Sequence, residues 1–290
     1  MPVFNGERTL KASVESVLLQ SYSNFELIII DDGSQDQSSA IIKLFSDKRI
    51  RVFTQTNSGL ARALNVAISH SNGEFIARQD QDDISMPTRI EKQVRKFNQN
   101  SGLVLLGTRG RTINHDGKQL GKIRLPVRNL DLKYLIIFSN PFIHTSVMMR
   151  TNVLKQIGGY SEDNDKQPPE DFELWGRIKE LGDIENLKEY LVHYRISAAS
   201  MSRQYEDTIA INYKKIVVEN LQKLFHFSER DAIAFFSLQF LSQNQYRCSV
   251  KLRLLYKFTF RFMKLQFESH IFSMTVYKST LKMLLRICIK

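Results

Sequence analysis

The stretch Phe25-Glu26-Leu27-Ile28-Ile29-Ile30-Asp31-Asp32-Gly33-Ser34 places a continuous apolar run directly before two aspartates and a glycine. An unbroken apolar run of this length is typical of a strand that is buried on both faces, as in a parallel sheet. The acidic turn predicts that the strand ends at Ile30 and that a loop follows. Because open α/β sheets bind ligands beyond the carboxyl ends of their strands, this loop is a candidate binding segment.

Apolar strands and amphipathic helices continue to alternate on both sides of this stretch. Residues 2–5 are expected to end a strand, and further strands are expected at 50–54, 75–77, 103–107, 142–149 and 190–195. Helices are expected near Leu10–Leu18, 41–45, 60–68, 87–97 and 130–138, before Gly158-Gly159, from Pro169, and from Thr208 onward. The pattern predicts an α/β fold with a mostly parallel twisted sheet flanked by helices.

Length and composition allow a chain of this kind to fold around a full core, since it has 290 residues of which 42% are hydrophobic. Cys248 and Cys288 have no metal-ligand spacing, so a disulfide framework and a thiolate zinc site are not indicated, and a reducing, cytoplasmic compartment is expected. No apolar run of about 18 residues and no signal-peptide pattern occur.

The net charge of +11 is concentrated at the end of the chain. Residues 246–290 carry ten Lys or Arg and one Glu, so the remainder carries only +2. Nucleic acid is excluded as a partner because the basic segment is predicted to be helical and lacks the sheet face of stacking aromatics that single-strand binders use. The segment either lies on an anionic membrane surface or packs as a helical extension with a solvated basic face.

Asp80-Gln81-Asp82-Asp83 follows the expected strand at 75–77 and is the most informative acidic group. Carboxylates one residue apart beyond a strand can share a divalent cation, Mn²⁺ or Mg²⁺, with a diphosphate. The alternative is an acidic turn that caps the helix beginning near Pro87. Arg78 either faces phosphate oxygens or forms a salt bridge with these carboxylates.

Three further positions have two interpretations each. Asp32 could accept from a uracil ring or a ribose, or simply form a turn that caps the next helix. Glu170-Asp171 could supply a general base, or could oppose the dipole of the helix that they begin. Trp175 could line an acceptor pocket or lie in the core, and His144 is expected to be a core histidine.

As a set, these segments resemble the family 2 glycosyltransferases, the inverting group with the GT-A fold. The resemblance covers residues 1 to about 200 and rests on the order and spacing of six stretches: 2–7 (PVFNGE), 25–34 (FELIIIDDGS), 57–60 (NSGL), 73–83 (GEFIARQDQDD), 87–90 (PTRI) and 170–175 (EDFELW).

The resemblance implies a role for each matching position. Phe4 and Asp32 would hold the nucleotide base, Asp80 would reach the ribose or the metal, Asp82 would hold the metal, and Asp171 would be the general base. The complete sets are, for catalysis, Asp171 and Glu170; for the donor, Pro2, Phe4, Asn5, Glu7, Asp32, Asn57, Gly59, Arg78 and Asp80; for the metal, Asp82 and Asp80; and for the acceptor, Trp175.

The implied protein is a metal-dependent, inverting glycosyltransferase that moves a hexose or N-acetylhexosamine from a nucleoside-diphosphate sugar, expected to be UDP-linked. The acceptor would be a glycan or a lipid-linked precursor in lipopolysaccharide or capsule synthesis, at the cytoplasmic face of the inner membrane. A GT-A domain is expected at residues 1–205, with a nucleotide-sugar half at 1–108 and an acceptor half at 109–205. A helical basic extension is expected at 206–290.

Three positions depart from the family pattern. The apolar residues that relatives carry before Pro2 are missing, which predicts either a start upstream of Met1 or a degenerate, weakly catalytic binding protein. Gln81 stands where a small residue is usual, with little expected effect. Ser197 stands near the place of a histidine that relatives use as a further metal or phosphate contact.

Overall fold

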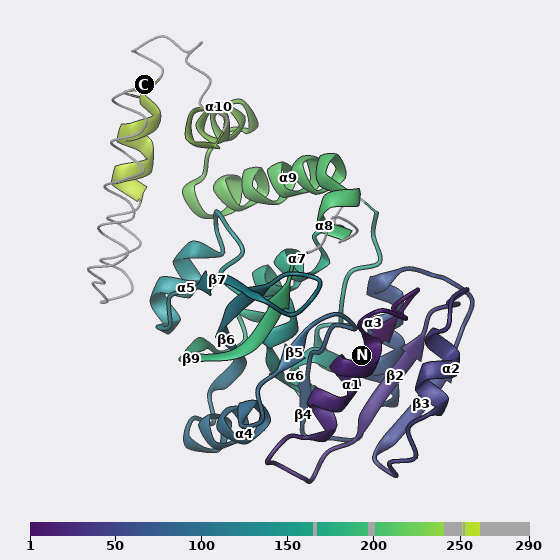
Figure 1. The fold of residues 1–290 in the computed structure, drawn as a ribbon. Coiled ribbons are helices and arrows are strands. Elements are labelled where there is room, and N and C mark those ends of the chain that lie inside the picture. The colour runs from purple at the N-terminus through teal and green to yellow at the C-terminus, as the bar shows by residue number, and fades with distance from the viewer. Residues whose placement is uncertain (165–166, 197–200, 241–250, 252, 262–290) are drawn as a thin grey trace.

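The computed structural model describes residues 1–164, 167–196, 201–240, 251 and 253–261. Figure 1 shows two adjoining sheets with helices around them, and the later helices α9 and α10 stacked over the second sheet. The first residues of the chain, in purple, lie in the first of these layers.

A small parallel sheet forms the first layer, in the order β1-β2-β3. Its strands are β1 (Pro2–Val3), β2 (Leu27–Asp31) and β3 (Ile50–Thr54), and its helices are α1 (Leu10–Leu18), α2 (Ser38–Lys43) and α3 (Leu60–His70). Leu27 and Ile29 pack toward α1 and α2, whereas Ile28 and Ile30 pack toward α3. The apolar run is therefore buried on both faces, as its composition predicts.

The second sheet has the order β4-β8-β6-β9-β5, with β7 paired to β6. Its strands are β4 (Phe75–Ala77), β5 (Ile84–Ser85), β6 (Leu103–Ile113), β7 (Gln119–Ile123), β8 (Met148–Arg150) and β9 (Asp183–Arg195). The α/β class is confirmed, but the expected parallel pairing holds here only between β6 and β9 among the described strands. A short turn such as that joining β6 to β7 permits only antiparallel pairing, because a parallel pair needs a long crossover.

The prediction of a strand at 142–149 is wrong for most of that range. Its first part is the short 3-10 helix η1 (His144–Ser146), and only β8 at its end is a strand. The side chains of Thr145 and Ser146 accept hydrogen bonds from the backbone of Asp80 and Thr108, and these tertiary contacts replace strand pairing. The other helices are α4 (Arg89–Gln99), α5 (Asn129–Leu135), α6 (Thr151–Gln156), α7 (Glu170–Ile178), α8 (Met201–Gln204), α9 (Glu206–Phe225) and α10 (Glu229–Phe240).

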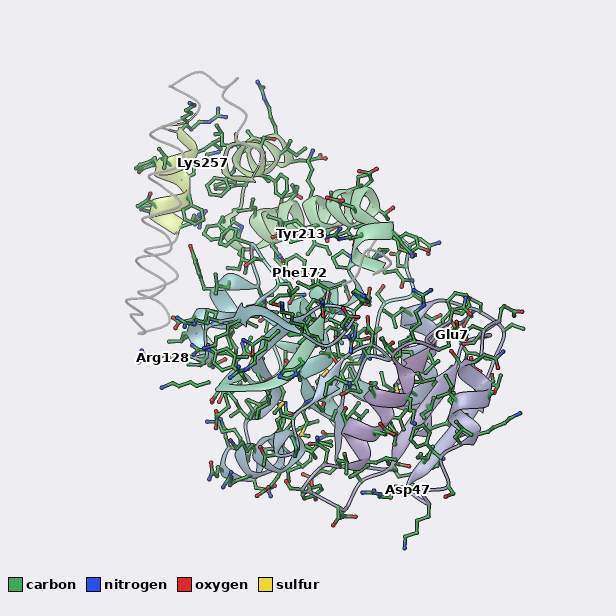
Figure 2. All side chains as sticks on the ribbon, viewed as in Figure 1. Glu7, Asp47, Arg128, Phe172, Tyr213 and Lys257 are labelled. Carbon is green, nitrogen blue, oxygen red and sulfur yellow. The ribbon has the colours of Figure 1, made fainter. Side chains whose placement is uncertain are left out.

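The helices after residue 205 share one apolar core with the second sheet. Phe258 is fully buried, with ring centroids 4.6 Å from Phe225 and 4.9 Å from Phe235. Phe172 of α7 stacks on Tyr213 of α9 with centroids 5.1 Å apart, as the labelled side chains in Figure 2 illustrate. The boundary expected near residue 205 stays a prediction, but the helices beyond it complete the core of the residues before it.

Most of the basic segment at 246–290 lies outside the described residues. Within its described part, Arg253 and Lys257 pair with Asp231 at 2.5 and 2.6 Å. Among all the residues that the structure describes, no helix is both long and apolar enough to cross a bilayer.

Candidate active site

The acidic loop, residues 80–83, is anchored to elements far apart in the sequence. Ser13 of α1 donates its hydroxyl to the carbonyl oxygen of Asp80 at 2.6 Å. The backbone N–H of Asp80 donates to Thr145 Oγ1 of η1 at 3.0 Å. These two bonds hold the start of the loop between the first helix and the second sheet.

Arg195, the last residue of β9, holds the other end of the loop. Its N–H donates to Asp83 Oδ1 at 2.7 Å, and its Nε donates to the Asp82 carbonyl at 2.8 Å. Its Nη1 also donates to the carbonyls of Asn114 and His115 in the β6–β7 turn. Arg195 thus ties the loop to the hairpin. Ser197, the departure from the family pattern that follows it, lies outside the described residues.

Arg78 forms a salt bridge with the first aspartate of the loop. Its Nη2 lies 2.6 Å from Asp80 Oδ1, and the arginine is only 3% exposed. Burial opposes the charged form of Asp80, but the guanidinium of Arg78, with smaller contributions from His144 and the N-terminal amine, holds the pKa of Asp80 below its ordinary value. Of the two interpretations of Arg78, the structure shows the salt bridge.

Asp82 has the opposite electrostatic environment. Burial, followed by the negative charge of Asp80, raises the pKa of Asp82 to about 6. A divalent cation would relieve this repulsion, and two carboxylates with diphosphate oxygens form a set of hard ligands that suits Mg²⁺ or Mn²⁺. Asp80 and Asp82 therefore fit the expected cation, although within the described chain no three acidic, His or Cys side chains are already gathered around a metal position.

Gln81 joins the acidic loop to the segment after β1. The N–H of Phe4 donates to Gln81 Oε1, and Gln81 Nε2 donates to the Phe4 carbonyl, both at 2.9 Å. The same amide covers Gly6, where an added Cβ would lie 2.5 Å from Oε1. The ring of Phe4 stays 42% exposed, so it is free to stack on a base. No sequence pattern indicated this clamp, and the expectation that Gln81 changes little did not foresee these two bonds.

Asn5 and Glu7 bind the loop that follows β2. Asn5 Oδ1 accepts from the N–H of Gln35 at 2.8 Å, and Glu7 Oε2 accepts from the N–H of Gln37 at 3.0 Å. Pro2 is buried in β1, paired with Ile30. Asn5 and Glu7, both predicted to bind the donor, therefore hold the backbone of the loop after β2 at the edge of the first sheet.

Asp32 organises the start of α3. Its Oδ1 accepts from the N–H of Ser58 at 2.9 Å and from Gln55 Nε2 at 2.7 Å, and its Oδ2 accepts from the N–H of Gly59 at 3.0 Å. Gly59 has a φ of 91°, a conformation that favours glycine. Asn57 is exposed beside this turn. Asp32 thus binds the backbone at the start of α3 and not of α2, the helix next in the chain that its turn was expected to cap, and its contact with a base stays a prediction.

Glu170 and His144 form a buried polar group at the start of α7. His144 Nδ1 lies 3.6 Å from Glu170 Oε1, and His144 Nε2 is 2.8 Å from the Tyr160 hydroxyl. Burial and the charge of Asp171 raise the pKa of Glu170 to about 7, and burial lowers the pKa of His144 to about 3. His144 thus lies mostly out of solvent, with a defined partner at each ring nitrogen.

Asp171 is held by two donors. Asn140 Nδ2 donates to its Oδ2 at 2.6 Å, and the N–H of Phe172 donates to its Oδ1 at 2.7 Å. Burial raises the pKa of Asp171, and the charge of Asp80 acts in the same direction. Because η1 contacts both Asp80 and Glu170, the structure brings the acidic loop and the start of α7 to one site.

Trp175 is fully buried, with its ring centroid 5.7 Å from Phe142 and 6.0 Å from His144. In this arrangement it offers no surface to an acceptor, and the core interpretation holds. Sequence reasoning did not single out Ser13, Asn140 or Thr145, because no spacing pattern distinguishes them from ordinary polar residues, and it named Gln81 only as a departure with little expected effect.

Comparison with known proteins gives a consistent family match. Residues 1–158 match the model of Glycosyl transferase family 2. The putative glycosyltransferase EpsE of Bacillus subtilis is 36% identical over 209 residues, covering 70% of this chain and 74% of that protein. The O-antigen biosynthesis glycosyltransferase WbnJ of Escherichia coli is 32% identical over 241 residues, covering 78% of this chain and 93% of that protein.

Among solved structures, S. aureus TarS in complex with UDP-GlcNAc has a TM-score of 0.58 at 19% identity, with coverage of 88% of this chain and 77% of that chain. This likeness confirms the GT-A type of fold that the sequence resemblance implied.

Proposed function

Since the chain belongs to glycosyl transferase family 2 and is a glycosyltransferase, we propose that it transfers a hexose or N-acetylhexosamine from a UDP carrier with inversion. The proposed acceptor is a glycan or lipid-linked precursor of a bacterial surface polysaccharide. The observation that supports this most is the meeting of the acidic loop with the start of α7, because transfer needs a diphosphate site beside a general base.

In the proposed reaction, Asp171 accepts the proton of the acceptor hydroxyl while that oxygen forms a bond to the anomeric carbon. The bond from this carbon to the diphosphate oxygen breaks on the opposite face, and the nucleoside diphosphate leaves. A single catalytic carboxylate suffices, unlike the carboxylate pair of glycosidases. The burial that raises the pKa of Asp171 makes it a better proton acceptor than an exposed aspartate.

Asp80 and Asp82 are the residues that would hold the divalent cation. When bound, such a cation neutralises negative charge on the diphosphate leaving group. The clamp between Gln81 and Phe4 keeps the acidic loop beside the exposed ring of Phe4, so the parts of the site proposed to hold the diphosphate and the base are linked.

The choice of UDP is motivated by the sequence resemblance and by TarS, whose structure is described as a complex with UDP-GlcNAc. The surface-glycan role is motivated by WbnJ, which is named for O-antigen biosynthesis. Calorimetric titration with UDP and with GDP, each with and without Mn²⁺, tests the donor. Cation-dependent UDP binding supports the proposal, whereas absence of binding to either nucleotide favours the degenerate alternative.

Two variants test the roles of the carboxylates. Asp82→Ala should remove the cation dependence of UDP binding, whereas Asp171→Asn should keep UDP binding and lose turnover. Asp47→Ala, just before β3, where Asp47 pairs with Arg49, is the control and should change neither. Equal loss of UDP affinity in Asp82→Ala and Asp171→Asn would contradict the assignment.

Binding of the basic segment to an anionic membrane surface is also part of the proposal, and the fold changes how it is tested. Truncation before residue 251 would remove Phe258 from the core, so a loss of membrane binding would be confounded by unfolding. Co-sedimentation of the full chain with anionic and with neutral vesicles at two salt concentrations avoids this problem. Equal recovery of the protein with anionic and with neutral vesicles would contradict binding to an anionic surface.

A further inference from the structure

The carboxylate proposed as the base has a neutral partner that neither the family resemblance nor the sequence pattern assigned. Asn140 lies in the segment between α5 and η1, and its Nδ2 donates to Asp171 Oδ2 at 2.6 Å. The remaining oxygen of the carboxylate, Oδ1, accepts from the N–H of Phe172 at 2.7 Å. With one donor on each oxygen, rotation of the carboxylate about its bond to Cβ is fixed.

The orientation of the Asn140 amide is itself determined by its surroundings. The backbone N–H of Phe142 donates to Asn140 Oδ1 at 3.1 Å. A backbone N–H can only donate, so the oxygen of the amide must face Phe142 and the NH₂ group must face Asp171. A donor thus points at the carboxylate.

The segment that carries Asn140 is held from two other elements. Asn186 of β9 donates its Nδ2 to the carbonyl of Pro141 at 3.1 Å, and Tyr213 of α9 donates its hydroxyl to the carbonyl of Phe138. The backbone on both sides of Asn140 is therefore fixed to the second sheet and to the helices stacked over it. Rigid support of this kind is what a group that orients a reactive carboxylate needs.

We propose that Asn140 is a positioning residue for Asp171. It fixes the orientation of the Asp171 carboxylate and leaves one lone pair on each carboxylate oxygen available to the acceptor hydroxyl. This inference rests on the proposed role of Asp171 as the base. Each carboxylate oxygen has two lone pairs and uses one in the bonds described, so capacity to accept a proton remains.

The surroundings of Asp171 explain why the partner is an amide. The titratable groups around it are Asp80, Glu170 and Tyr160. Burial and the charge of Asp80 raise the pKa of Asp171, and the hydrogen bond from Asn140 opposes this rise. A cationic partner would lower the basicity of the carboxylate further, whereas an amide stabilises its ionised form without adding charge.

The chain offers a matched control elsewhere in the second sheet. Asn129 Nδ2 donates to Asp183 Oδ1 at 2.7 Å, and Asn129 Oδ1 accepts from the N–H of Ile184 at 3.0 Å. The pair has the same chemistry as Asn140 with Asp171. It lies at the beginning of β9, whereas Arg195 and the acidic loop lie at its end.

The test compares Asn140→Ala, Asn140→Asp and Asn129→Ala for the pH profile of kcat and for UDP affinity. Asn140→Ala should raise the apparent pKa of the base by about one unit, the effect of one lost net hydrogen bond. It should also lower kcat by about tenfold, because the carboxylate is no longer held in one orientation. Asn140→Asp should raise the apparent pKa further, since a second carboxylate faces the first. UDP affinity should be unchanged in all three, and Asn129→Ala should keep the wild-type profile.

A second readout does not depend on turnover. The carbon-13 signal of the Asp171 carboxyl, identified as the signal lost in Asp171→Asn, can be titrated in the wild type and in Asn140→Ala. A shift of about one unit supports the proposal; an unshifted titration overturns it. Turnover retained by Asp171→Asn would instead refute the proposed base, so the two failures are distinguishable. Equal losses of kcat and UDP affinity in Asn140→Ala would also overturn the positioning role, since they indicate general damage.

Discussion

The clamp between the acidic loop and the segment after β1 leads to a quantitative prediction. Gln81→Ala removes both hydrogen bonds to the backbone of Phe4 and leaves the rest of the loop in place. Each neutral hydrogen bond contributes about 0.5–1.5 kcal/mol net, and these two are partly exposed, so about 1–2 kcal/mol of preorganisation is lost at most. UDP affinity should fall by a factor of up to about thirty, measured calorimetrically in saturating Mn²⁺.

A second variant reaches the same clamp from the other side. In Gly6→Ala the new Cβ would lie 2.5 Å from Gln81 Oε1, so the amide must move. If the clamp is the cause, the losses in Gly6→Ala and Gln81→Ala should not add in the double variant. Gln99→Ala, an exposed glutamine at the end of α4, should leave UDP affinity unchanged. Unchanged affinity in Gln81→Ala, or additive losses in the double variant, would refute the reasoning.

Three other predictions concern stability and the cation. Phe258→Ala should lower the free energy of unfolding by about 3–5 kcal/mol in a denaturant titration, because it empties a fully buried site against Phe225; a loss below about 1 kcal/mol would contradict the shared core. Because the folded-state pKa of Glu170, about 7, lies above its ordinary value of 4.5, the folded state holds this proton more tightly, and stability should fall by up to about 3 kcal/mol as pH rises from 4.5 to 7. Glu170→Gln should remove that part of the slope in unfolding measured across this range, and an unchanged slope would show that other groups cause it. Arg195→Lys cannot donate both to the Asp82 carbonyl and to the β6–β7 turn, so the Mn²⁺ concentration needed for half-maximal UDP binding should rise several-fold, and an unchanged value would exclude Arg195 as a support of the loop.

The sequence predicted those elements whose local pattern and tertiary environment agree. The run before Asp31 is a strand buried on both faces, and the helix from Leu10 packs by the residues that its spacing selected. The strand expected at 142–149 failed because its hydroxyl side chains bind backbone groups more than 35 residues away, which no local pattern encodes. The expected parallel pairing holds in the first sheet and between β6 and β9, whereas the other described pairs of the second sheet are antiparallel, because pairing direction depends on how the chain connects the strands.

The sequence indicated the acidic residues of the candidate site but not their supports. Asp80, Asp82 and Asp171 were selected because the family motif places them in order, beyond a strand and at a helix start. Gln81 and Asn140 act through single amides whose partners are backbone or carboxylate groups distant in the chain. The contacts of Gln81 and Asn140 therefore depend on the tertiary fold and are not visible in the local sequence.

The core shared by the second sheet and the late helices has a consequence for synthesis of the chain. The small parallel sheet and α1 to α3, all within residues 2–70, leave the ribosome long before the late helices do. The apolar surface around Phe138 and Phe172 has no complete cover until residue 258 has emerged. At about 5–20 residues per second, that surface is exposed for several seconds during translation. A nascent chain halted before this point would present an uncovered apolar face, the kind of surface that chaperones bind.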